Sequence, residues 1–164
     1  MTTTAEPTAH APTARELLQE RIRSVSTRAP ATIQAGRPLA EALESMRAAR
    51  GDCLVVCRGD RVAGIITERD VLLKVLGRDV DRSRPVDEFM TAEPDTLTPD
   101  ASFGQALAMM DQGGYRNIPL VEDGRLVGLV RQQDVIAYVA EAFPEEILNL
   151  PPRPHQRLEE PEGA

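Results

Sequence analysis

Lysine and tryptophan are almost missing from this 164-residue chain, which has a single lysine, Lys74, and no tryptophan. Three phenylalanines and two tyrosines complete the aromatic set, so the core is expected to be aliphatic. The formal net charge is −7, the isoelectric point is about 4.9 and the arginines are scattered. Binding to nucleic acid or to an anionic membrane draws on clustered Lys and Arg, so neither partner is expected.

Long hydrophobic runs are also missing. Every apolar run is far shorter than the about 20 residues that a membrane-spanning helix needs. The N-terminus lacks the charged-then-apolar order of a signal peptide. We therefore expect a cytoplasmic protein.

Few residues are available for a catalytic or metal centre. The two histidines, His10 and His155, fall in segments expected to be tails, and no serine lies in a strand-to-helix nucleophile elbow. Cys53 and Cys57 lie in one predicted strand, where their Cα atoms would be roughly 13 Å apart, too far for a disulfide. We predict two buried thiols, no metal site and no enzymatic activity.

A repeat organises the chain. A shift of 64 positions aligns its two halves without a gap, and aligned positions that differ mostly keep their apolar character. Within residues 32–72 the identical pairs are Thr32 and Thr96, Ala42 and Ala106, Leu43 and Leu107, Met46 and Met110, Arg61 and Arg125, Gly64 and Gly128, Asp70 and Asp134, and Val71 and Val135.

Each copy is predicted to form a β-α-β-β-α unit, which places the chain in the α/β class. A short extended segment precedes a helix with apolar residues at i, i+3, i+4 and i+7, and two apolar strands joined by a hairpin turn precede a closing helix. The predicted extended segments are 31–34 and 95–98, and the predicted strands are 53–57, 62–66, 117–121 and 126–130. The closing helices are expected to carry their apolar residues on one side, with Val71, Leu72, Val75 and Leu76 in the first copy and Val135, Ile136 and Val139 in the second.

The predicted organisation has five parts. These are a disordered tail over 1–12, a first repeat with its lead-in helix over 13–76, a polar connector over 77–85, a second repeat over 86–142 and a mobile tail over 143–164. Thr13 and Glu16 have the spacing of a capping box and predict a helix over 13–24. One unit buries too little surface to stand alone, so the sheets are expected to pack together and to leave a ligand cleft between them.

The segments 64–70 and 128–134 are the most informative local pattern, and they allow two interpretations. Thr67 and Asp70 have the spacing of a helix cap. The same geometry offers N–H groups and a hydroxyl to a phosphate and a carboxylate to ribose hydroxyls. The second copy keeps Asp134 although Arg131 has replaced the capping hydroxyl, which favours a ligand role for both aspartates.

Together with the lead-in 86–91 and the segments 95–100 and 115–121, these motifs resemble paired cystathionine-β-synthase (CBS) domains, also called Bateman modules. The resemblance covers roughly residues 22–142. It implies two clefts related by pseudo-twofold symmetry, frequent assembly into homodimers, and binding of AMP, ADP, ATP, or sometimes S-adenosylmethionine, NAD or a dinucleotide.

The resemblance also assigns residues to the two clefts. In one, it implies that Asp70 holds the ribose and Thr67 the phosphate or ribose, completed by Asp95, Thr96, Arg116 and Pro119. In the other, it implies that Asp134 holds the ribose, completed by Ala31, Thr32 and Val55.

Two departures from the family pattern make the clefts unequal. Arg131 occupies the usual Ser/Thr position, where it would bind a phosphate or fill the cleft. Asp52 stands where the second repeat has Arg116, so the Asp134 cleft is expected to have lost a cation at that position and to present a negative charge to a phosphate. We predict that the Thr67/Asp70 cleft is the better nucleotide site and that the other is weaker, differently selective or empty.

Two functions are therefore expected to compete. The first is a regulatory module that binds an adenine nucleotide or S-adenosylmethionine between its repeats and signals to a separate partner protein. The alternative is a constitutive dimeric adaptor with empty clefts, whose segment 151–154 docks elsewhere.

Overall fold

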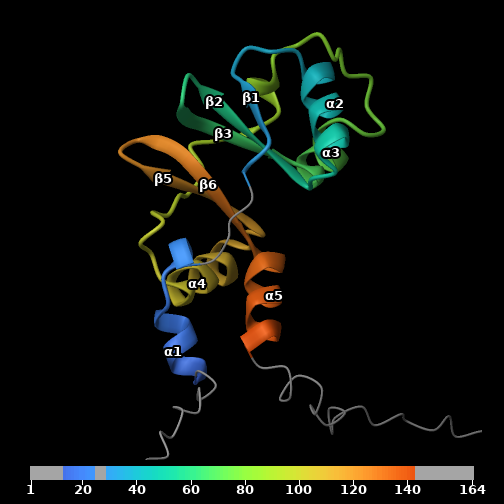
Figure 1. Ribbon diagram of the computed structural model, residues 1–164. Coiled ribbons are helices and arrows are strands. Elements are labelled where there is room, and N and C mark those ends of the chain that lie inside the picture. The colour runs from blue at the N-terminus through green and yellow to red at the C-terminus, as the bar shows by residue number, and fades with distance from the viewer. Residues whose placement is uncertain (1–12, 25–28, 143–164) are drawn as a thin grey trace, which may run out of the picture.

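The computed structural model describes residues 13–24 and 29–142, which form two units of the same design (Figure 1). The segments 1–12, 25–28 and 143–164, with the predictions that fall on them, lie outside the described residues. The first unit contains β1 (Thr32–Gln34), α2 (Leu39–Ala49), β2 (Cys53–Arg58), β3 (Arg61–Thr67) and α3 (Glu68–Lys74). The second contains α4 (Phe103–Gly113), β5 (Asn117–Glu122), β6 (Arg125–Arg131) and α5 (Gln132–Ala142). The predicted β-α-β-β-α order is confirmed in the first unit.

The first strand of the second unit is much shorter than expected. Only Leu97 forms a bridge there, parallel to Leu120 of β5, whereas β1 pairs with β2 over three residues. In the first unit the Val55 N–H donates to the Ala31 carbonyl. Pro119 occupies the position of Val55 in the second unit and has no N–H, so the corresponding hydrogen bond cannot form.

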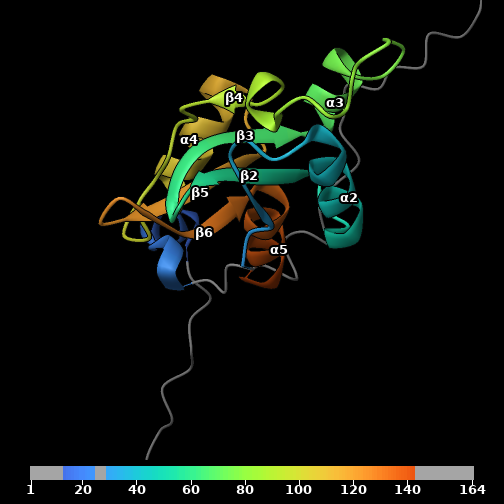
Figure 2. The ribbon, with the colours of Figure 1, turned by 90° about the horizontal axis from the view of Figure 1, so that it is seen from above.

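The lead-in to the second unit completes the sheet of the first. It contains a 3₁₀ turn (Val86–Glu88) and the short strand β4 (Thr91–Ala92), which pairs antiparallel with β3. The first sheet therefore has the order β1-β2-β3-β4, and Figure 2 shows β4 beside β3. A side chain at Gly64 would overlap Met90 and lie 2.9 Å from the Thr91 carbonyl, so glycine permits this close pairing.

The helices cover the outer faces of two sheets that face each other. Figure 1 shows α2 and α3 beside the first sheet and α4 and α5 on the far side of the second. Each helix layer has its own apolar cluster, and a third cluster joins the two sheets. The third cluster contains Cys53, Val55, Cys57, Ile65 and Leu129. The predicted burial of strands on both faces is thus confirmed for β2, which has five consecutive buried residues.

Two details of the helices differ from the predictions. Thr13 forms the expected capping box with Glu16, but the helix α1 (Ala14–Gln19) ends early, and a 3₁₀ turn follows over Ile22–Ser24. The chain leaves the helix because the Ile22 and Arg23 N–H groups donate to the carbonyls of Ala101 and Pro99 in the second unit.

The buried sides of α3 and α5 are narrower than expected. Val75 and Val135 are buried, whereas Leu72, Leu76 and Ile136 are 60%, 55% and 61% exposed, so the prediction of a single apolar side is wrong for these three. Val71 and Val135 pack inward, and because the next residue of a helix points about 100° away, Leu72 and Ile136 turn outward. Leu76 lies beyond the end of α3. Among the helices of the described residues, none is long and apolar enough to cross a membrane.

Candidate functional site

A cleft of about 620 Å³ lies between the two repeats, at the start of α3. One wall comes from the end of β3 and the first turns of α3, and the other comes from 91–95 and 113–117. The lining residues are Asp52, Ile65, Thr67, Glu68, Arg69, Asp70, Leu72, Thr91, Glu93, Pro94, Asp95, Gly113, Gly114, Tyr115, Arg116 and Asn117. Four of the six residues predicted for the first cleft, Thr67, Asp70, Asp95 and Arg116, therefore line one cavity.

Thr67 and Asp70 form a complete capping box at the start of α3. The Asp70 N–H donates to Thr67 Oγ1 at 3.3 Å, and Asp70 Oδ2 accepts from the Thr67 N–H at 3.0 Å and the Thr67 hydroxyl at 2.7 Å. Asp70 Oδ1 pairs with Lys74 Nζ at 2.8 Å, and the Asp70 side chain is 14% exposed. The structure thus contains the helix cap that the sequence predicts, and the same Asp70 carboxylate also lines the cavity.

Asp70 is held in its charged form by these contacts. Burial raises the pKa of its carboxyl, but the hydrogen bonds from Lys74 and Thr67 together bring that pKa below its ordinary value of 3.8. The carboxylate is therefore an anionic acceptor at neutral pH.

The opposite wall carries an aromatic ring fixed by a hydrogen bond. Tyr115 follows Gly114, which ends α4 in the left-handed conformation with φ 65°. The Tyr115 hydroxyl donates to Asp95 Oδ2 at 2.7 Å, and this bond raises the pKa of the phenol. Asp95 and Tyr115 are thereby locked together at the edge of the cavity.

Asp52 and Asn117 meet where the two repeats come together. The Asn117 amide donates to Asp52 Oδ2 at 3.0 Å, while Asn117 Oδ1 is buried with no hydrogen-bond partner among the described residues. The sequence predicts Asp52 as a feature of the other cleft; the structure instead places it in this cavity together with Arg116.

The cleft is acidic on balance. Its lining includes the five carboxylates of Asp52, Glu68, Asp70, Glu93 and Asp95 against the two guanidinium groups of Arg69 and Arg116. Neither arginine forms an ion pair with another described residue. In the part of the chain that the structure describes, no group of three or more His, Cys, Asp or Glu residues could hold a metal ion.

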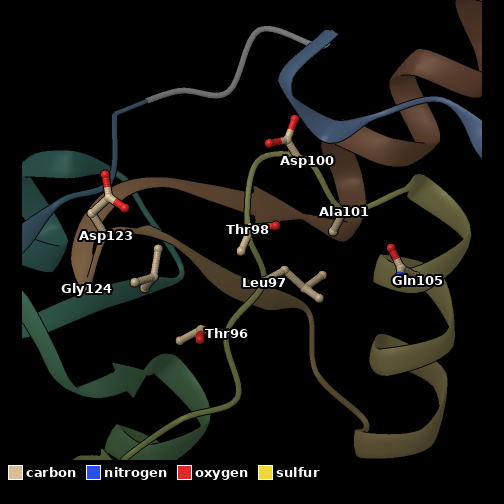
Figure 3. A pocket seen from close by; sticks show the side chains of 9 residues that line it. Thr96, Leu97, Thr98, Asp100, Ala101, Gln105, Asp123 and Gly124 are labelled. Carbon is tan, nitrogen blue, oxygen red and sulfur yellow. The ribbon is translucent and has the colours of Figure 1, made fainter.

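The other two residues predicted for this cleft lie elsewhere. Pro119 is fully buried in β5. Thr96 lines a separate cavity of about 600 Å³ with Thr98, Asp100 and Asp123, shown in Figure 3. The charged groups of that cavity are both carboxylates, and Asp100 is already paired with Arg21 and Arg23.

The residues predicted for the second cleft are spread over β1, β2 and the junction of β6 with α5. Val55 is fully buried in the cluster between the sheets, and its backbone pairs with that of Thr32, next to the partly exposed Ala31. Asp134 lies in the first turn of α5. Arg131 Nε and Asp134 Oδ2 are buried, and neither atom has a hydrogen-bond partner among the described residues.

Comparison with known proteins identifies the family. The family model described as CBS domain matches the chain twice, over residues 22–77 and 86–141. The chain therefore belongs to the CBS domain family and carries two of these domains in tandem.

Individual relatives agree with this assignment. An uncharacterized 17.7 kDa protein of Acidianus ambivalens is 35% identical over 99 residues, which are 59% of each chain. The solved structure of a putative signal-transduction protein with CBS domains from Burkholderia ambifaria is 28% identical, with a TM-score of 0.67 over 73% of this chain and 91% of that one. A CBS domain protein from Pyrobaculum aerophilum, solved in complex with AMP, shares the fold at 20% identity, with a TM-score of 0.66 over 74% of this chain and 99% of that one.

Proposed function

We propose that this chain is a non-catalytic regulatory module that binds an adenine nucleotide or a related adenosyl compound in the cleft between its two repeats. The observation that carries the proposal is the cavity of about 620 Å³ built from both repeats, with the Asp70 carboxylate on one wall and Tyr115 and Arg116 on the other. The AMP complex of the Pyrobaculum protein supports this ligand class for the fold.

Each part of the proposed ligand has a suitable group in the cleft. Asp70 is an ionised acceptor for the two ribose hydroxyls, with Thr67 beside it. Tyr115 offers an aromatic face to the base, and its hydrogen bond to Asp95 fixes the ring. Arg116 and Arg69 offer guanidinium donors to a phosphate. Binding a phosphate would not require either arginine to break an ion pair with another described residue.

The excess of carboxylates sets the number of phosphates that the cleft tolerates. Two guanidinium groups balance about one phosphate, and each further phosphate adds negative charge beside Glu68, Glu93 and Asp52. Affinity is therefore expected to fall from AMP to ADP to ATP in the absence of divalent cations. S-adenosylmethionine, which carries positive charge, is the favoured alternative ligand.

The proposal extends to a weaker second site at Asp134, with Ala31, Thr32, Val55 and Arg131. The buried Arg131 Nε and Asp134 Oδ2, which have no partner among the described residues, support a polar ligand there. We also propose a homodimer that signals to a separate protein in the cytoplasm. Exposed Leu72, Leu73 and Leu76 support the dimer, because a second copy would remove them from water.

Ligand-dependent stability tests the function. AMP at 100 times its Kd stabilises a native state by about 2.7 kcal/mol, which for a chain of this size raises Tm by roughly 5–10 °C. Asp70→Asn is expected to remove most of this shift, whereas Asp111→Asn, which changes an exposed carboxylate of α4 outside the cleft lining, keeps it.

The outcomes separate the competing functions. No shift with AMP, ADP, ATP or S-adenosylmethionine in the unmodified chain would favour the constitutive adaptor. An equal shift in Asp70→Asn, with equal affinity by calorimetry, would show that the ligand binds elsewhere.

A further inference from the structure

The only lysine of the chain lies beside the proposed ribose carboxylate. Lys74 is the last residue of α3, one helical turn after Asp70. Its Nζ pairs with Asp70 Oδ1 at 2.8 Å and donates to the carbonyls of Phe89 at 2.7 Å and Met90 at 3.5 Å. A lysine ammonium has three donors, and here three acceptors converge on it.

The two carbonyls belong to the segment that forms the opposite wall of the cleft. Phe89 is anchored in the core with 6% exposure, and Met90 packs against the same cluster. The chain then forms β4 and reaches Thr91, Glu93 and Asp95, which line the cavity. Lys74 thus contacts both Asp70 on one wall and the root of the other wall.

Asp70 has about four lone-pair sites, and three of them are already in use, so a ligand that donates two hydroxyls must displace one of the present contacts. Oδ2 accepts from Thr67 and Oδ1 from Lys74. One ribose hydroxyl can use the remaining lone pair of Oδ1, and a second hydroxyl on that oxygen competes with the ammonium for the lone pair that Lys74 now uses. The Lys74 ammonium then keeps only its hydrogen bonds to the carbonyls of Phe89 and Met90. A change in the contacts of Asp70 therefore changes how Lys74 holds the segment that follows these two residues.

We propose that Lys74 is a positioning residue that transmits the state of the Asp70 carboxylate to the cleft wall over 91–95. The ligand-dependent part of this inference rests on the proposed function. The coupling itself rests only on the three contacts of Lys74 within the chain. Because 91–95 leads directly into the second repeat, the coupling gives the cleft a route to the rest of the molecule.

Hydrogen exchange at a single amide tests the coupling. The Glu93 N–H donates to the Ala63 carbonyl at 3.1 Å and reports how firmly the wall is held against β3. In the full chain without ligand, Lys74→Met is expected to accelerate exchange at Glu93 at least fivefold. Asp70→Asn should produce an effect in the same direction, and the double variant should show little more than the larger single effect.

A matched control separates coupling from general destabilisation. Arg37→Met also removes an i,i+4 ion pair of the first repeat, which joins Arg37, just before α2, to Glu41 in its first turn. It is expected to leave exchange at Glu93 within twofold of the unmodified chain. The coupling is overturned if Lys74→Met also leaves the exchange rate at Glu93 within twofold of that of the unmodified chain. It is overturned as well if the effects of Lys74→Met and Asp70→Asn on that rate are additive in the double variant.

The single side-chain amine gives a second readout that a purely structural role would not change. Lys74 is 39% exposed and is not part of the cavity lining, so a bound nucleotide does not cover it. Saturating AMP is expected to raise the rate of amine acylation at Lys74 at least threefold relative to the N-terminal amine, and Asp70→Asn should show the raised rate without AMP.

The two proposals fail in different ways. If AMP does not bind by calorimetry, the proposed function falls, while the exchange experiment still decides the coupling. If AMP binds and the acylation rate stays unchanged, transmission through Lys74 is overturned and the proposed function stands.

Discussion

Asp70 and Asp134 occupy the same position in the two repeats and have different surroundings. Asp70 is enclosed by Thr67 and Lys74, whereas one oxygen of Asp134 is buried without a partner among the described residues. The difference follows from two positions: Arg131 replaces the capping threonine, and Tyr138 stands where the first repeat has Lys74. Asp70 and Asp134, although they occupy equivalent positions of the two repeats, are therefore expected to contribute differently to stability and to ligand binding.

The pH dependence of stability reflects this difference. The pKa of Asp70 is lower in the folded chain, so its charged form contributes stability above the ordinary value of 3.8, and that contribution is lost as pH falls through the folded pKa. Asp70→Asn is expected to reduce the free energy of unfolding by about 1 kcal/mol at pH 7. The difference from the unmodified chain should shrink as pH falls below 3.8 in urea denaturation. A difference that grows in acid, or that Asp111→Asn reproduces, would contradict this account.

The site shows what sequence patterns reveal at the level of single residues. Thr67, Asp70, Asp95 and Arg116 line one cavity, and each lies at or near an end of a predicted strand or helix. Lys74 was recoverable as an i,i+4 partner of Asp70, but its bonds to the Phe89 and Met90 carbonyls depend on the path of the connector, which has no local pattern. The contact between Asp52 and Asn117 depends on how the two sheets meet, which residue spacing does not encode.

At the scale of elements, the short helix α3 carries more apolar surface than it buries. Leu72 and Leu73 are both about 60% exposed, and Leu76 follows just beyond the helix. Leu72 also lines the cleft, so the ligand site and the apolar surface share a side chain. This surface is the expected contact between two copies of the chain.

A charge on this surface tests the dimer. Leu73→Glu is expected to convert a dimer into a monomer in sedimentation velocity, because a buried, unpaired carboxylate would cost several kcal/mol at the interface. Leu18→Glu places the same charge on α1, where Leu18 is 45% exposed, and should leave the dimer intact. A monomeric unmodified chain, or equal dimerisation of both variants, would contradict the assignment.

Local sequence patterns were sufficient to predict most of the strands, but not every helix end or strand length. The repeat and the hairpins followed from periodicity and turn residues. The strand β2 is one residue longer than predicted at its C-terminal end, and β3 is one residue longer at each end. The early end of α1 and the short first strand of the second unit were not foreseen. The first depends on hydrogen bonds to residues almost 80 positions away, and the second depends on Pro119 of a neighbouring strand.

At the scale of the whole molecule, the repeats share a core and cannot be regarded as independent domains. The cluster between the sheets combines Val55 and Ile65 of the first repeat with Leu129 of the second. The strand β4, which precedes the second repeat in sequence, belongs to the first sheet. The two repeats are therefore expected to unfold together.

Two natural probes report on the repeats separately. Both cysteines lie in β2 of the first repeat, and both tyrosines lie in the second repeat. Burial raises the pKa of Cys53 to about 12, so the native thiol stays protonated and unreactive. Thiol exposure and tyrosine fluorescence are expected to give the same urea midpoint within error. Midpoints that differ clearly would show that the repeats unfold in separate steps.

The position of β4 has a consequence for how such chains diverge. The boundary between the repeats in the gene is not a boundary in the fold, because the strand after the connector completes the preceding sheet. A recombination event that replaced the second repeat with one from a relative would also replace the edge strand of the retained first sheet. The fit of Gly64 against the Met90 side chain and the Thr91 carbonyl would then depend on residues from two different ancestors. Selection should therefore keep the pair together as a single heritable unit.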